Sequence, residues 1–176
     1  MKQRIISTSV AAVALVVVTA IGAEPQTADP VKLTPRPKMV AWEQGKLRLT
    51  KATKIMYSGE GAKAEAESLG EKLRPATGYP FPVAGPPPAN TAFFGILLEL
   101  QPKANHLGNE GFMMEVGPGM ARIAAATTNG LAKGCSILVQ LLPAAILEKK
   151  PQENVKWEMP CCKLFDLPDD AGGITK

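Results

Sequence analysis

Few side chains in this sequence could carry acid–base chemistry. Asp169 and Asp170 form the one adjacent pair of acids, and paired carboxylates can act as general acid and general base. The pair stands beside a glycine-rich stretch at the C-terminal end of the sequence, where order is poor unless other contacts hold the chain. We interpret the pair as part of a solvated segment, so the sequence predicts no catalytic residue.

Nucleophilic and metal chemistry have equally little support. His106 is the only histidine and no His-Glu-x-x-His is present, whereas a zinc site needs several ligands at suitable spacing. We expect His106 on a surface loop. No Gly-x-Ser-x-Gly occurs, and no Lys-Ser or Lys-Thr follows Gly117-Pro118-Gly119 to make a phosphate loop. The sequence therefore predicts no metal and no cofactor.

The three cysteines allow two interpretations. Cys161 and Cys162 are neighbours, and neighbouring cysteines rarely bridge each other because the small ring strains the peptide between them. A disulfide from Cys135 to one of them is compatible with an oxidising compartment. In the other interpretation Cys135 is a buried helix residue and the remaining two are free thiols.

Two tryptophans, Trp42 and Trp157, could stack on a sugar ring. Large aromatic side chains more often pack in a core or at its edge, and with so few aromatics available we favour packing for both.

The first 23 residues have the layout of a secretory signal. Lys2 and Arg4 precede an apolar run from Ile5 to Ile21, and small residues follow at 20–23. An uncleaved anchor is the alternative, but the run is short for a membrane span. We expect cleavage after Gly22 or Ala23, export to the periplasm or the exterior, and no stable membrane anchor.

Composition indicates one ordinary globular domain. The chain has 176 residues, of which 45% are hydrophobic and 20% charged. Its net charge of +4 falls to about +2 once Lys2 and Arg4 are removed. Because the basic residues are scattered singly, nucleic acid is not expected as a partner.

Apolar periodicity predicts the secondary structure. One helix is expected over Gly61–Leu73, ended by Pro75, and another from a cap at Thr127 or Thr128 to about Leu142. Strands are expected at Met39–Trp42, Leu47–Thr50, Thr53–Ser58, Thr91–Leu100, Gly111–Val116, Met120–Ala125 and Val155–Met159, with a turn at Glu43-Gln44-Gly45 and a hairpin at Gly117-Pro118-Gly119. Hairpins rather than alternating crossovers indicate an α+β fold, with one mixed sheet and two helices on one face.

Several phrases, taken in order, resemble the accessory domain that precedes the catalytic barrel in family 20 β-N-acetylhexosaminidases. They are Pro35-Arg36-Pro37, Trp42-Glu43-Gln44-Gly45-Lys46-Leu47, Leu73-Arg74-Pro75-Ala76-Thr77-Gly78-Tyr79-Pro80, Gly108-Asn109-Glu110-Gly111-Phe112, Gly130-Leu131-Ala132-Lys133-Gly134, Leu138-Val139-Gln140-Leu141-Leu142-Pro143, Trp157-Glu158-Met159-Pro160 and Asp166-Leu167-Pro168. The resemblance implies a fold with the topology of the zinc proteases. It divides the chain into a signal peptide (1–23), an extended lead-in (24–34), the accessory domain (35–160) and a C-terminal tail where the barrel would begin (161–176).

The resemblance also defines what is expected to be missing. In the family, Asp-x-Pro leads to an Arg-Phe and a Trp-Arg-Gly, whereas Pro168 here precedes Asp169. The sugar-binding arginine and the adjacent Asp-Glu pair of the barrel have no counterpart. We therefore expect an exported accessory domain, inactive alone, from a truncated or split enzyme acting on terminal N-acetylhexosamine. The alternative is a stand-alone module that binds carbohydrate or protein.

The resemblance further implies that both helices lie between the sheet and a barrel, which would be a separately encoded partner. Lys133, Ser136 and Gln140 fall on one face of the second helix. We expect this polar face to meet the barrel, and we expect the domain to be monomeric without it.

Overall fold

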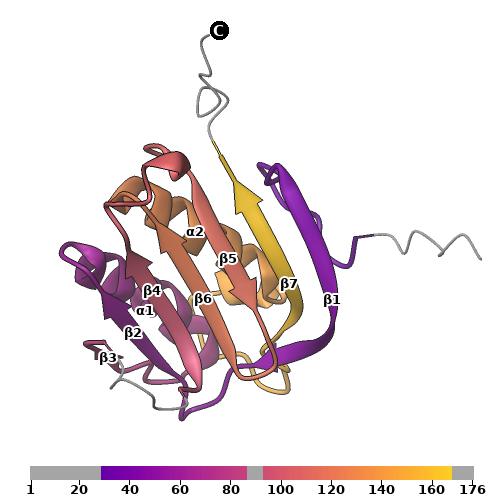
Figure 1. The fold of residues 1–176 in the computed structure, drawn as a ribbon. Helices are drawn as coiled ribbons and strands as arrows, with labels where there is room; N and C mark the ends of the chain where they lie inside the picture. The colour runs from indigo at the N-terminus through magenta and orange to yellow at the C-terminus, as the bar shows by residue number, and fades with distance from the viewer. Residues whose placement is uncertain (1–28, 87–92, 168–176) are drawn as a thin grey trace, which may run out of the picture.

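The computed structural model describes residues 29–86 and 93–167. Over these residues the chain forms one seven-stranded sheet in the order β1-β7-β5-β6-β4-β2-β3. Figure 1 shows the strands, which are β1 (Met39–Arg48), β2 (Lys54–Ser58), β3 (Val83–Ala84), β4 (Gly95–Leu100), β5 (Phe112–Val116), β6 (Met120–Ala125) and β7 (Glu158–Asp166).

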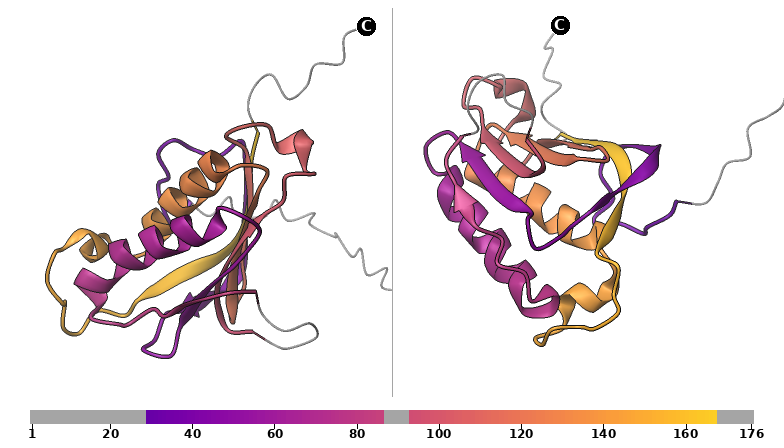
Figure 2. Two further views of the ribbon diagram at one scale, coloured as in Figure 1. Left: turned by 90° about the vertical axis from the view of Figure 1, so that its left-hand side faces the viewer. Right: turned by 90° about the horizontal axis from the view of Figure 1, so that it is seen from below.

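Two long helices cover one face of this sheet, as Figure 2 shows. They are α1 (Ala62–Thr77) and α2 (Thr128–Leu141), and two 3₁₀ turns, η1 (Asn105–Leu107) and η2 (Ala144–Leu147), complete the fold. Strands β2, β3, β4 and β6 run parallel, while β5 and β7 pair antiparallel with their neighbours. The expected mixed sheet with two helices on one face is confirmed. No helix in the described part of the chain is long and apolar enough to cross a membrane.

The core lies between the helices and the inner face of the sheet. Leu69 and Leu73 of α1 and Leu131 and Leu138 of α2 are buried there, at the helical spacing that the sequence shows. Thr127 caps α2, because its side chain accepts a hydrogen bond from the Gly130 amide. This cap and the span of α2 match the expectation.

The first helix runs past the proline that was expected to end it. Pro75 lies inside α1, which continues to Thr77. The proline removes the amide that would bond the Glu71 carbonyl, but both residues are exposed, so water can satisfy that carbonyl. The helix ends instead at Gly78, whose φ of 66° allows its amide to donate to the Arg74 carbonyl at 2.9 Å.

The first two expected strands are one strand. Met39–Arg48 is continuous, and Glu43-Gln44-Gly45 is a bulge against β7 rather than a turn, because the pairing shifts between Trp42 and Lys46. Gly45 has a φ of 106°, which explains the glycine there. The composition of Glu43-Gln44-Gly45 is typical of a turn, and for that reason the prediction of a turn was wrong.

The last strand is longer than expected and lies later in the chain. It covers Glu158–Asp166 instead of Val155–Met159, so its second half occupies residues that were assigned to a tail. Cys162, Leu164 and Asp166 are buried while Lys163 between them is exposed, which is the period of a strand. The strand is internal, between β1 and β5.

Close contacts explain two glycines of the quoted phrases. Gly111 is not among the positive-φ glycines. A Cβ atom there would lie 1.9 Å from the Leu107 carbonyl oxygen, so backbone contact excludes a side chain. At Gly134, inside α2, a Cβ would lie 2.6 Å from Ile123 Cγ2, so close packing of the helix on the sheet accounts for this glycine.

Candidate functional site

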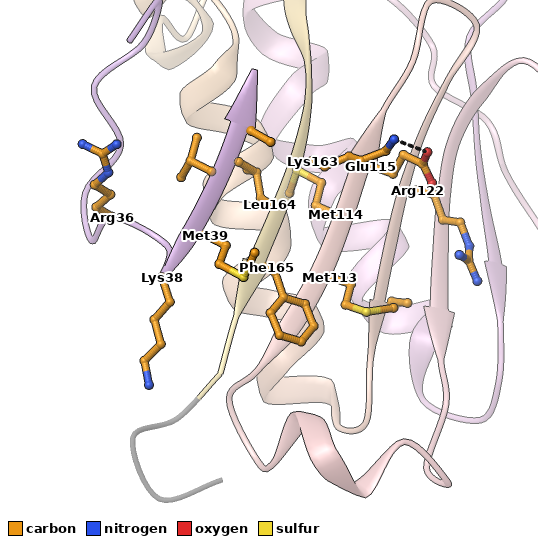
Figure 3. A pocket seen from close by; sticks show the side chains of 13 residues that line it. Arg36, Lys38, Met39, Met113, Met114, Glu115, Arg122, Lys163, Leu164 and Phe165 are labelled. Carbon is orange, nitrogen blue, oxygen red and sulfur yellow. Dashed lines mark ion pairs between the residues drawn. The ribbon is translucent and has the colours of Figure 1, made fainter. Parts of the chain in front are cut away.

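A groove lies on the outer face of the sheet, opposite the helices. Its volume is about 640 Å³, within the range of about 300–1,000 Å³ typical of small-molecule sites. Figure 3 shows the side chains that line this outer groove, which are Arg36, Lys38, Met39, Val40, Ala41, Met113, Met114, Glu115, Arg122, Ala124, Lys163, Leu164 and Phe165. Because successive side chains of a strand point to opposite faces, Met113, Glu115, Lys163 and Phe165 face the groove, whereas the side chains of Met114 and Leu164 between them are buried in the core.

An apolar row crosses four strands at one end of the outer groove. Met39 pairs with Phe165, Phe165 with Met113, and Met113 with Ala124. The Phe165 ring lies between the two methionine side chains in Figure 3. Met39 is 64% exposed, so the row is open to solvent on a rigid backbone.

A charged row lies two residues further along the same strands. Lys163 pairs with Glu115, and Glu115 with Arg122. The Lys163 ammonium lies 3.9 Å from the Glu115 carboxylate and 2.8 Å from that of Glu43, and its pKa is raised because it donates a hydrogen bond to Glu43. Arg122 Nε donates to the Glu99 carboxylate on β4. These ion pairs and hydrogen bonds fix the positions of the donors and acceptors in the charged row.

The lead-in segment is held beside the groove residue Arg36 and against the domain. Arg36 lies 2.9 Å from the Asp29 carboxylate, which also accepts a 2.8 Å hydrogen bond from Trp42 Nε1. Further along, the Gln140 side-chain amide exchanges two hydrogen bonds with the Thr34 backbone, at 2.8 and 2.9 Å. These contacts join the lead-in to β1 and to α2.

His106, Trp42 and Trp157 do not line this groove. Asp169 and Asp170 are outside the described residues. His106 is exposed on the η1 turn. Trp157 is 2% exposed and packs in the core, and Trp42 packs at its edge. In the part of the chain that the structure describes, no three His, Cys, Asp or Glu side chains could jointly hold a metal ion.

All three cysteines are buried and free, which rules out the disulfide interpretation in this structure. Burial raises the pKa of Cys135 and of Cys162 to about 12 and also raises that of Cys161. Because the thiolate is the reactive form, these residues are structural rather than nucleophilic.

The sequence analysis missed the outer groove. The strand period of Met113 and Glu115 between buried neighbours could have indicated an outward face. Nothing local indicated that β7 would lie between β1 and β5, which is what places Phe165 between Met39 and Met113.

Comparisons with known proteins match this fold to one family. The family model described as Glycosyl hydrolase family 20, domain 2 matches residues 31–166. The N-acetyl-β-hexosaminidase of Streptomyces plicatus, solved in complex with Thio-NAglucal, is 30% identical over 76% of this chain and 25% of its own, with a TM-score of 0.66. The GH20 β-N-acetylhexosaminidase of Streptomyces coelicolor A3(2) gives 30% identity, 76% and 26% coverage and the same TM-score of 0.66.

A more distant structure shares the fold. The GH20 exo-β-N-acetylglucosaminidase of Vibrio harveyi is 20% identical over 77% of this chain and 19% of its own, with a TM-score of 0.57. A search of curated proteins found no match. The chain spans about a quarter of the length of the Streptomyces structures. The match to most of its length shows that the chain belongs to glycosyl hydrolase family 20, as that family's domain 2.

Proposed function

We propose that this chain is the non-catalytic domain of an exported β-N-acetylhexosaminidase, with the catalytic groups on a barrel outside these 176 residues. The observation that carries the proposal is the match of residues 31–166 to domain 2 of the family. A Streptomyces plicatus relative was solved with the product GlcNAc, so terminal N-acetylhexosamine is the substrate class we propose for the assembled enzyme.

The chemistry of the described residues supports inactivity of the chain alone. Family 20 hydrolysis is substrate-assisted and needs carboxylates fixed around the scissile bond. Glu115 in the outer groove forms an ion pair with Lys163, and Glu99 on the neighbouring strand β4 forms one with Arg122. Because each carboxylate is paired with a cation, neither is proposed as a proton donor.

Export is supported by the basic start and apolar run of residues 1–23, which lie outside the described part of the chain.

The helix layer is the side we propose for the barrel, but not through the polar face expected from the sequence. Lys133 is half-buried and lies 2.9 Å from Asp166 on β7, and Gln140 is bonded to Thr34. A groove of about 240 Å³ between α1, α2 and η2 is better suited to contact a barrel, because Leu147 is 76% exposed at its rim. Apolar Pro75, Val139 and Ile146 line it with charged residues around them, the layout of an interface core with a polar rim.

The test is whether the purified chain forms a complex with a family 20 barrel prepared without its own domain 2, such as that of the Streptomyces plicatus enzyme. Light scattering is expected to show a 1:1 complex that Leu147→Lys abolishes. The matched control is Met39→Lys on the opposite face, which has a similarly exposed side chain and should leave the complex intact. Absence of any complex, or its loss only with Met39→Lys, would argue against the proposed function.

The second candidate function is a stand-alone binding module. The outer groove favours it, and the two candidates are compatible because this groove and the helix layer lie on opposite faces of the sheet (Figure 2).

A further inference from the structure

We infer that the outer groove binds a pyranose unit of an N-acetylated glycan. The groove is defined by its geometry alone, while the identity of the sugar rests on the proposed function. The bound unit would lie across β1, β7, β5 and β6, the strands that contribute most of the lining residues.

The apolar row provides the surface for the sugar ring. A pyranose has one face of C–H groups, and aromatic side chains bury such faces well. Phe165 is half-buried, with Met39 and Met113 directly beside it on the neighbouring strands (Figure 3). Ala124 ends the row but is 1% exposed, so the accessible surface is formed by Met39, Phe165 and Met113, and the flexible thioether of Met113 can pack against an acetamido methyl group.

The charged row provides hydrogen bonds for hydroxyl groups. Lys163, Glu115 and Arg122 come from three adjacent strands, which lie about 4.8 Å apart, so a ring-sized ligand reaches two of them. Each of these cations faces a carboxylate, Lys163 that of Glu43 and Arg122 that of Glu99. A row with charges compensated in this way favours a neutral ligand with both donors and acceptors over a phosphate or another anion.

A second copy of the chain suits this face less well. Stable interfaces bury about 800 Å² on each partner around an apolar centre. The large hydrophobic residues exposed in the described part of the chain are Met39, Phe94 and Leu147, and only Met39 lines the outer groove. One row of apolar side chains beside a charged row is wide enough for a sugar but narrow for a protein.

The experiment is a titration of the isotope-labelled chain with tri-N-acetylchitotriose, followed by two-dimensional NMR. Amide shifts are expected in β5, β6, β7 and the start of β1, with a Kd of about 1 mM because the groove is open. Phe165→Ala should weaken binding about fivefold to tenfold. Phe94→Ala, which removes an exposed aromatic outside the groove, should leave the Kd unchanged.

Glu115→Gln provides a second variant that keeps side-chain size if Phe165→Ala does not fold. It removes the charge facing Lys163 and should weaken binding about threefold. Cellotriose, which lacks the acetamido groups, should bind more weakly than the acetylated sugar.

Four results would overturn the inference: no shifts at saturating sugar, shifts centred on the helix layer, equal binding of cellotriose, or an unchanged Kd in both groove variants. Shifts of the groove amides with protein concentration in the absence of sugar would assign the face to a second copy and overturn it as well. If the chain bound the sugar but did not assemble with a barrel, the result would count against the proposed function alone. If it assembled with a barrel but did not bind the sugar, the result would count against this inference alone.

Discussion

Replacing Gly111 by alanine is expected to lower the free energy of unfolding by about 3 kcal/mol, at the upper end of the usual cost of overpacking. The new Cβ would lie 1.9 Å from the Leu107 carbonyl oxygen and 2.8 Å from that of Asp166. Both neighbours are backbone atoms, so no side chain can rotate away. One of them belongs to Asp166 of β7, and its displacement would disturb the pairing of Asp166 with Phe112 on β5.

Thermal and urea unfolding of the two chains measure this effect, with an expected fall in Tm of about 10 °C. Gly117→Ala is the matched control. It sits in the adjoining hairpin, where the nearest atom to a new Cβ is the Met120 carbonyl oxygen at 3.9 Å, and its stability should stay within about 0.5 kcal/mol. Equal stability of the Gly111 and Gly117 variants would show that the loop before β5 can shift to accept a side chain.

Alkaline pH is expected to destabilise the chain through its buried thiols. The pKa of Cys135 is raised from 9.0 to about 12, chiefly by burial and further by Glu65. A raised folded-state pKa stabilises the protonated form, so its contribution is complete below pH 9 and is lost as the pH rises through about 12. Each pKa unit corresponds to about 1.4 kcal/mol, so Cys135 alone should cost about 3 kcal/mol by pH 11.

Urea unfolding of the chain and of Cys135→Ala between pH 7 and 11 tests this. Tyrosine and lysine titrate in both proteins, so the difference between the two isolates the thiol. The variant should be less stable than the unmodified chain at pH 7, because it loses buried volume. This difference in the free energy of unfolding should shrink or reverse by pH 11. If the free energies of unfolding of the two proteins changed in parallel with pH, the result would contradict a buried, protonated Cys135.

The sequence was most informative where the signal is local. The hydrophobic spacing of α2 and its cap at Thr127 were predicted, as was the hairpin around 117–119, because each depends on neighbours in the chain. The bulge at Gly45 was misread, since a glycine with positive φ suits a turn and a bulge equally and only the pairing with β7 separates them.

The outer groove depends on strand order, which local pattern does not encode. Met39 and Phe165 are neighbours across strands although they stand at opposite ends of the domain. The fold also brings together Lys133 of α2 and Asp166 of β7, whose ion pair occupies part of the helix face that was expected to meet a barrel. The constraint on Gly111 likewise comes from tertiary structure, because the backbone atoms that a Cβ would meet belong to Leu107 and to Asp166 of β7.

The central claim is that this chain is a family 20 domain without the hydrolytic groups. The most direct measurement is release of a chromogenic aglycone from an N-acetylglucosaminide by the purified chain. No release above the uncatalysed rate is expected, with activity appearing only when a catalytic barrel is added. If the chain alone released the aglycone and Asp169→Asn or Asp170→Asn abolished the release, the acid pair would be catalytic and the proposal of an inactive domain would be wrong.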